Sequence, residues 1–125
     1  MNESFANRYF RAAVLYALIG MSWGIYMAIS EDHGTYPAHA HLLLLGWASM
    51  ALYGAIYRLC PKAADGTLPR IHFWLAQAAL VVMIPGVALA HSGHAMGEPL
   101  AAVGSLATIL AMALFALTVW RGTAA

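Results

Sequence analysis

Two histidines, His39 and His41, stand at the start of a strongly apolar segment, four leucines at 42–45 followed by Gly46 and Trp47. An imidazole at the edge of such a segment loses hydration, which is unfavourable unless something binds the ring. A neutral imidazole is a good ligand for haem iron, copper or zinc. On a regular helix, two side chains two residues apart are rotated by roughly 200°. The pair therefore predicts two separate sites, or one site with a supporting contact, and argues against chelation of one ion.

A second candidate group consists of His91, His94 and Met96. If the preceding helix continued through them, the two histidines would share a face and could hold one ion. A thioether beside two imidazoles suits copper in particular. The alternative, which the residues leave open, is a flexible polar loop made of Ser, Gly and His.

Composition places these residues in lipid. Apolar residues make up 62% of the 125 residues and charged residues only 9%, whereas a soluble domain has about 25% charged residues. A single domain, residues 1–125, is expected at this length. The one cysteine, Cys60, excludes an internal disulfide and a cysteine-rich metal site.

The elements that must position the histidines are four apolar helices. The expected ranges are residues 10–30, 38–59, 71–90 and 99–120. Each is close to the roughly 20 residues that cross the hydrocarbon core of a bilayer. The first is too long for the core of a signal peptide and is expected to be retained as a span. Short connections predict an all-α, up-down unit of four transmembrane helices.

Charge placement predicts the orientation. All six basic residues fall on one side of the predicted bundle: Arg8, Arg11, Arg58, Lys62, Arg70 and Arg121. The other side has acidic residues and five of the six histidines: Glu31, Asp32, Glu98, His33, His39, His41, His91 and His94. The positive-inside rule then predicts both termini in the cytoplasm of a bacterial-type inner membrane, with the histidines facing the periplasm or outside.

The gathering of five histidines on one side favours metal or haem over imidazoles that are merely hydrated at the interface. His72 is the exception. It lies on the cytoplasmic side, roughly 30 Å from the others across the membrane. We expect it to be an ordinary interfacial side chain.

The residues around His39 and His41 resemble a motif of a known protein family. Asp32, followed by Ala38-His39-Ala40-His41 entering an apolar helix with Gly46 and Trp47, resembles the haem-binding helix of haem-copper oxidase subunit I. That family includes cytochrome c oxidases and nitric oxide reductases. The resemblance implies that His39 would ligate an active-site haem and His41 a low-spin haem.

The resemblance also has implications for assembly. The chain would correspond to one four-helix arc of a twelve-helix subunit, so a homotrimer with haems between protomers is expected, and a dimer is the other arrangement. His91 and His94 loosely resemble the family's copper-binding pair, which in the family is adjacent. The third copper histidine and an intramembrane carboxylate for protons are missing. Oxygen reduction is therefore not implied, and enzyme activity, of the oxidoreductase type, stays open.

Three functional hypotheses follow. The first is a membrane cytochrome that binds haem b, with or without copper as a second bound metal. It would serve in electron transfer or in binding O2 or NO. The signature for covalent haem attachment is absent, so this haem would be held by axial ligands and packing. The second is copper or zinc handling or sensing without haem through four residues: His33, His91, His94 and Met96. The third is a purely structural bundle. The lipid bilayer is the expected partner in each case, nucleic acid is not, and the redox partner is undetermined.

Overall fold

All regular elements of the protein are helices in a computed structural model, which describes residues 2–124. No strand occurs in that range. Four helical segments are long and apolar enough to cross a membrane: Glu3–Ser30, Tyr36–Leu59, Leu68–Ala90 and Gly97–Thr123. The predictions of an all-α chain and of four apolar helices of membrane-spanning length are confirmed. These helices indicate a multi-pass membrane protein.

The helices divide into seven elements: α1 (Asn2–Ser30), α2 (Tyr36–His41), η1 (Leu42–Ala48), α3 (Ser49–Leu59), η2 (Pro61–Ala64), α4 (Leu68–Ala90) and α5 (Gly97–Thr123). α1 begins at Asn2 and not near residue 10 as predicted, so Arg8 and Arg11 lie within the helix. Pro37 lies in the first turn of α2 and Pro69 in that of α4. Proline suits this position because the missing N–H would have no partner inside the helix.

The second membrane-length segment changes its winding directly after His41. η1 is a π-helix, a wider coil that closes hydrogen bonds five residues apart. At its end the backbone N–H of Ser49 donates to the Leu44 carbonyl, and the Ser49 hydroxyl donates to the same oxygen at 2.8 Å. This winding changes the angular position of the residues after His41 relative to an unbroken α-helix.

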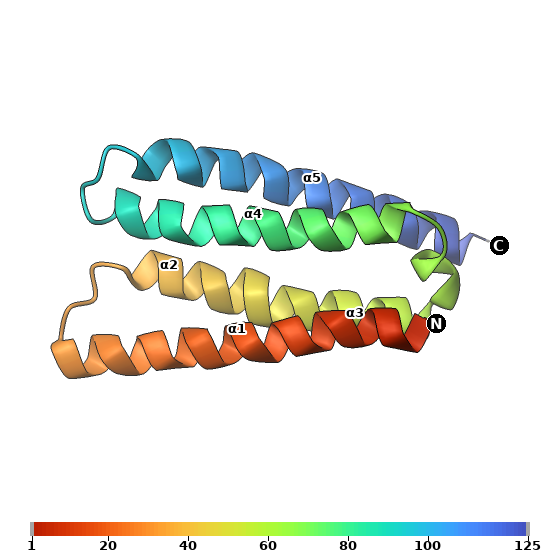
Figure 1. The fold of residues 1–125 in the computed structure, drawn as a ribbon, viewed down its shortest axis with the longest axis horizontal. Coiled ribbons are helices and arrows are strands. Elements are labelled where there is room, and N and C mark those ends of the chain that lie inside the picture. The colour runs from red at the N-terminus through yellow and green to blue at the C-terminus, as the bar shows by residue number, and fades with distance from the viewer. Residues whose placement is uncertain (1, 125) are drawn as a thin grey trace.

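The four long segments lie side by side, with both chain ends at one end of the molecule (Figure 1). We call this the basic end, because it carries six residues: Arg8, Arg11, Arg58, Lys62, Arg70 and Arg121. The opposite end holds the connections 31–35 and 91–96 and is called the histidine end (Figure 1).

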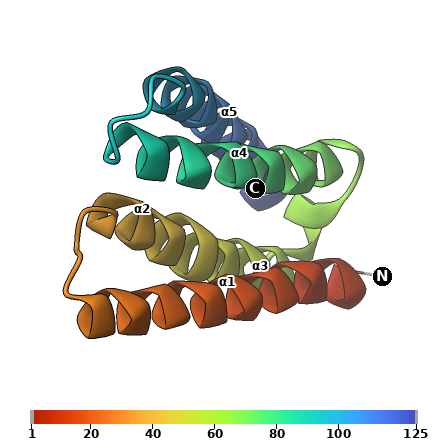
Figure 2. The same cartoon turned by 60° about the vertical axis from the view of Figure 1, so that its left-hand side comes forward.

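α1 and α5 are the outer helices of the arrangement, and α4 lies against the second segment between them (Figures 1 and 2). Buried residues make up 44% of the most apolar stretch of α4 but only 17% of those of α1 and α5. The two outer helices therefore leave broad apolar faces uncovered by the chain itself, as expected for surfaces that contact lipid or another protein.

Candidate functional site

His41 ends α2 at the histidine end, and its side chain is exposed. Its Nδ1 lies 2.6 Å from the carbonyl oxygen of Pro37, one turn earlier. A carbonyl can only accept a hydrogen bond, so Nδ1 carries the proton in the neutral ring. Nε2 is then left with a free lone pair. A backbone carbonyl fixes the ring of many metal-ligating histidines in this manner.

The helical segment that follows His41 carries exposed apolar side chains. Leu44 is 65% exposed and Trp47 is 43% exposed. Both lie on η1, within two turns of the imidazole. An oriented imidazole with exposed apolar side chains within two turns suits a flat apolar ligand that carries a metal ion better than it suits a hydrated ion.

His39 lies on another side of α2 and is half-buried. Its ring packs against α1 at Gly24, where an added Cβ would lie 2.9 Å from His39 Cε1. Its Nδ1 is buried and has no hydrogen-bond partner among the described residues. His39 and His41 therefore have different surroundings: the His39 ring packs against α1, whereas the His41 ring is exposed.

The turn at 91–96 differs from the helical arrangement that would place His91 and His94 on one face. α4 ends at Ala90, and His91 is its C-terminal cap. Gly93 has a φ of +78°, which a glycine adopts readily and a helix does not permit. The condition for a shared helical face is not met. The His91 ring instead donates from Nδ1 to the Val87 carbonyl at 2.9 Å, which leaves Nε2 free, as in His41.

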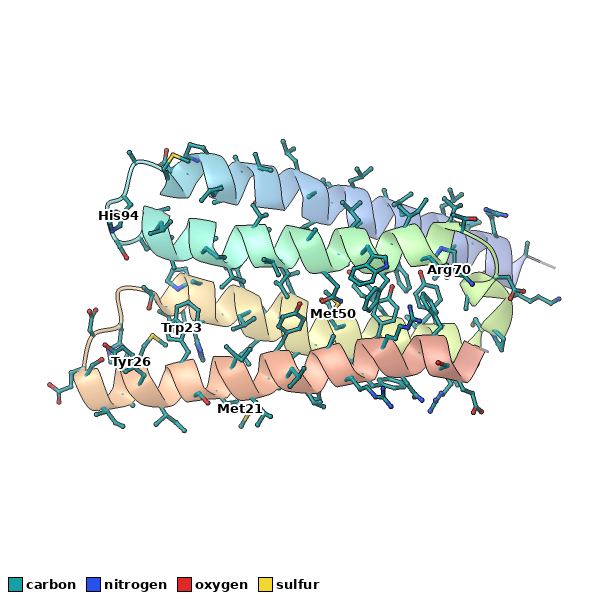
Figure 3. All side chains as sticks on the ribbon, in the orientation of Figure 1. Met21, Trp23, Tyr26, Met50, Arg70 and His94 are labelled. Atoms are coloured by element: carbon teal, nitrogen blue, oxygen red, sulfur yellow. The ribbon has the colours of Figure 1, made fainter. Side chains whose placement is uncertain are left out.

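The histidines of the histidine end do not cluster with one another or with acidic side chains among the described residues. In residues 2–124, no three His, Cys, Asp or Glu side chains lie close enough to hold one ion. His33, His91 and His94, the nitrogen ligands of the copper or zinc hypothesis, are thus not gathered within the described chain. His94 and Met96 are exposed on the same turn (Figure 3 labels His94).

His72 is the residue whose environment the sequence did not predict. It is 0% exposed, not interfacial. Two phenols reach its Nδ1, Tyr9 of α1 at 2.8 Å and Tyr57 of α3 at 2.9 Å. The Tyr57 hydroxyl also lies 3.2 Å from Thr118 Oγ1 on α5. One imidazole therefore connects all four long helical segments at the basic end.

Aromatic rings enclose this imidazole. The Tyr53 ring is 4.7 Å from it at 82°, and the Phe115 ring is 5.1 Å away at 30°. His72 Nε2 is buried without a hydrogen-bond partner in the part of the chain that the structure describes. The spacing of Tyr53 and Tyr57, four residues apart on one helix, was the signal in the sequence for an aromatic face. It does not reveal which residue that face encloses.

A smaller polar group lies further along the helices. Tyr16 donates its hydroxyl proton to Gln77 Oε1, and Gln77 Nε2 donates to Met50 Sδ at 3.3 Å. These bonds join α1, α4 and α3, and satisfy the amide inside a span, where an unpaired polar group is unfavourable.

No protein family, no curated protein and no solved structure matches this chain.

Proposed function

We propose that this chain is a membrane protein that binds haem b at the histidine end, with His41 as an axial ligand of the iron. The observation that supports this most strongly is the His41 ring itself, exposed and oriented by its 2.6 Å bond to the Pro37 carbonyl. The bound haem would supply a redox-active iron for electron transfer or for binding O2 or NO, as in proteins that resemble haem-copper oxidase subunit I.

A haem suits the geometry because its iron needs only one or two protein ligands, whereas a structural zinc site needs four. The Pro37 carbonyl would hold the imidazole in the tautomer that leaves Nε2 free. Leu44 and Trp47, both exposed on η1, would contact the macrocycle and help to exclude water.

The assembly proposed with this function is a homotrimer. His41 is exposed, and the outer helices α1 and α5 have exposed apolar faces. A second copy could therefore supply the other axial ligand and cover those faces. Native mass measurement of the haem-loaded protein should give three chains. Two chains would indicate the dimer, and monomers alone would contradict shared ligation.

The membrane placement is part of the proposal. The basic end would face the cytoplasm of a bacterial-type inner membrane, and the histidine end the periplasm or outside. The six basic residues at one end support this orientation.

The test is the absorption spectrum of His41→Ala. Loss of an outer-shell partner of a metal ligand already weakens affinity by about 10–100-fold, so removing an axial ligand itself should abolish most of the Soret band in protein purified under equal conditions. His94→Ala is the matched control, since His94 is exposed and makes no side-chain hydrogen bond in the described chain. Added imidazole should restore the band in His41→Ala. A wild-type spectrum in that variant would remove His41 as the ligand.

A second candidate is copper or zinc binding without haem, which the free Nε2 of His91 favours. Further ligands would then come from neighbouring copies or from the thioether of Met96, because the described chain does not gather His33, His91 and His94 around one ion. Stoichiometric copper in a protein without a Soret band would favour this candidate over haem.

A further inference from the structure

A cleft of about 490 Å³ opens at the basic end, far from the candidate haem ligands. Its walls come from α1, from η2 with the connection that follows it, and from α4. The lining includes Phe5, Arg8, Asp65, Arg70 and Trp74. Figure 3 shows Arg70 at this end, opposite His94.

Two arginine side chains of the cleft are available to bind a ligand. Arg8 and Arg70 are exposed, and neither guanidinium group forms a hydrogen bond or an ion pair within residues 2–124. Arg58 at the same end differs, because it donates to Asn7 Oδ1 at 2.8 Å and lies over the Phe10 ring. The forked donors of arginine match phosphate oxygens. Asp65 is the one carboxylate in the described lining, so the cleft has a formal charge of +1.

The surface next to the cleft, further along α4 from the basic end, is apolar. Trp74 is 64% exposed, and Val81, seven residues further along the same face of α4, is 63% exposed. Tryptophan is typical of the depth at which headgroups meet hydrocarbon. Phe5 lines the cleft and packs edge-on against the Tyr57 ring, with centroids 5.3 Å apart. The basic cleft is thus followed along α4 by an exposed apolar surface, and a ligand with a charged head and a hydrocarbon tail matches this arrangement.

We propose that the cleft binds the phosphodiester of an anionic phospholipid, with Arg8 and Arg70 on the phosphate and an acyl chain along Trp74 and Val81. The single negative charge of phosphatidylglycerol matches the cleft's formal charge of +1. Free phosphate shares the head chemistry but makes no use of the apolar face. The site does not depend on haem binding.

Native mass spectrometry of the detergent-purified protein, titrated with phosphatidylglycerol, tests the proposal. Arg8→Gln combined with Arg70→Gln should reduce lipid retention by about tenfold or more, since each charge-assisted bond contributes at least a tenfold factor. Arg11→Gln combined with Arg121→Gln is the matched control. It removes the same charge at the same end from residues outside the cleft and should retain lipid like the wild type.

Three outcomes would overturn the proposal. Equal losses in the two double variants would show general charge attraction and no site. Displacement of lipid by inorganic phosphate, at an ionic strength matched with chloride, would identify free phosphate as the ligand. Arg70→Lys keeps the charge and removes the forked donor, so it guards against misfolding of the double variant. Full lipid retention in Arg70→Lys would contradict recognition by the guanidinium fork.

Discussion

The histidines of this chain differ in what their Nδ1 atoms contact. In His41 and His91 that nitrogen donates to a backbone carbonyl one turn earlier, at 2.6 Å and 2.9 Å. In His72 it meets the hydroxyls of Tyr9 and Tyr57. The first two rings are exposed with a free Nε2, which suits a ligand from outside. His72 is enclosed, which suits a structural connection between helices.

The role of His72 predicts a stability difference. His72→Leu leaves the buried phenols of Tyr9 and Tyr57 without their shared partner. It should lower the free energy of unfolding by about 2–4 kcal/mol. Tyr57→Phe removes one bonding hydroxyl and should lower it by about 1 kcal/mol. Denaturation by sodium dodecyl sulfate in mixed micelles, followed by tryptophan fluorescence, measures both.

The exposed His94 provides the control for that series. His94→Ala should change the free energy of unfolding by less than about 0.5 kcal/mol. If His72→Leu were as stable as this control, the buried imidazole would have no part in holding the helices together.

At the scale of elements, glycines set how closely the helices approach. An added Cβ at Gly104 of α5 would lie 2.6 Å from the Cα of Met83 on α4, so the obstacle is backbone. At Gly20 of α1 the added Cβ would lie 2.7 Å from Leu43 Cδ2, the far end of a flexible side chain. Backbone cannot move aside without separating the helices, whereas a leucine can change rotamer.

The same substitution should therefore have different effects at these two positions. In Gly104→Ala, overpacking against backbone should cost about 1–3 kcal/mol. The gain of about 1 kcal/mol in helix propensity offsets part of this cost, so the expected net destabilisation is up to about 2 kcal/mol. Gly20→Ala should be neutral or slightly stabilising. Unfolding titrations of both variants under the same conditions check the comparison. Equal effects would show that backbone contact at Gly104 does not set the distance between α4 and α5.

At the scale of the whole molecule, charge separates the two ends. The basic end carries every Lys and Arg of the chain, and the histidine end carries none. This separation supports the proposed orientation, in which the phospholipid cleft faces the inner leaflet and the candidate haem ligands lie near the outer surface.

Thiol labelling in intact cells tests this orientation. With the native thiol removed by Cys60→Ser, a cysteine introduced by Ser92→Cys should react with a membrane-impermeant maleimide added outside. One introduced by Lys62→Cys should react only after lysis. Both positions are exposed, so burial does not explain a difference. The reverse pattern would invert the proposed topology.

Sequence alone determined that this protein has four apolar helices of membrane-spanning length, because apolar content and segment length are local properties. It also determined that His39 and His41 face different ways, since helical spacing sets their relative angle. Only tertiary structure decided that His39 faces α1 at Gly24. It also decided that α4 ends before His94, and that His72 is enclosed. The partners of His72 come from helices 63 and 15 residues away along the chain, and no local pattern specifies such a meeting.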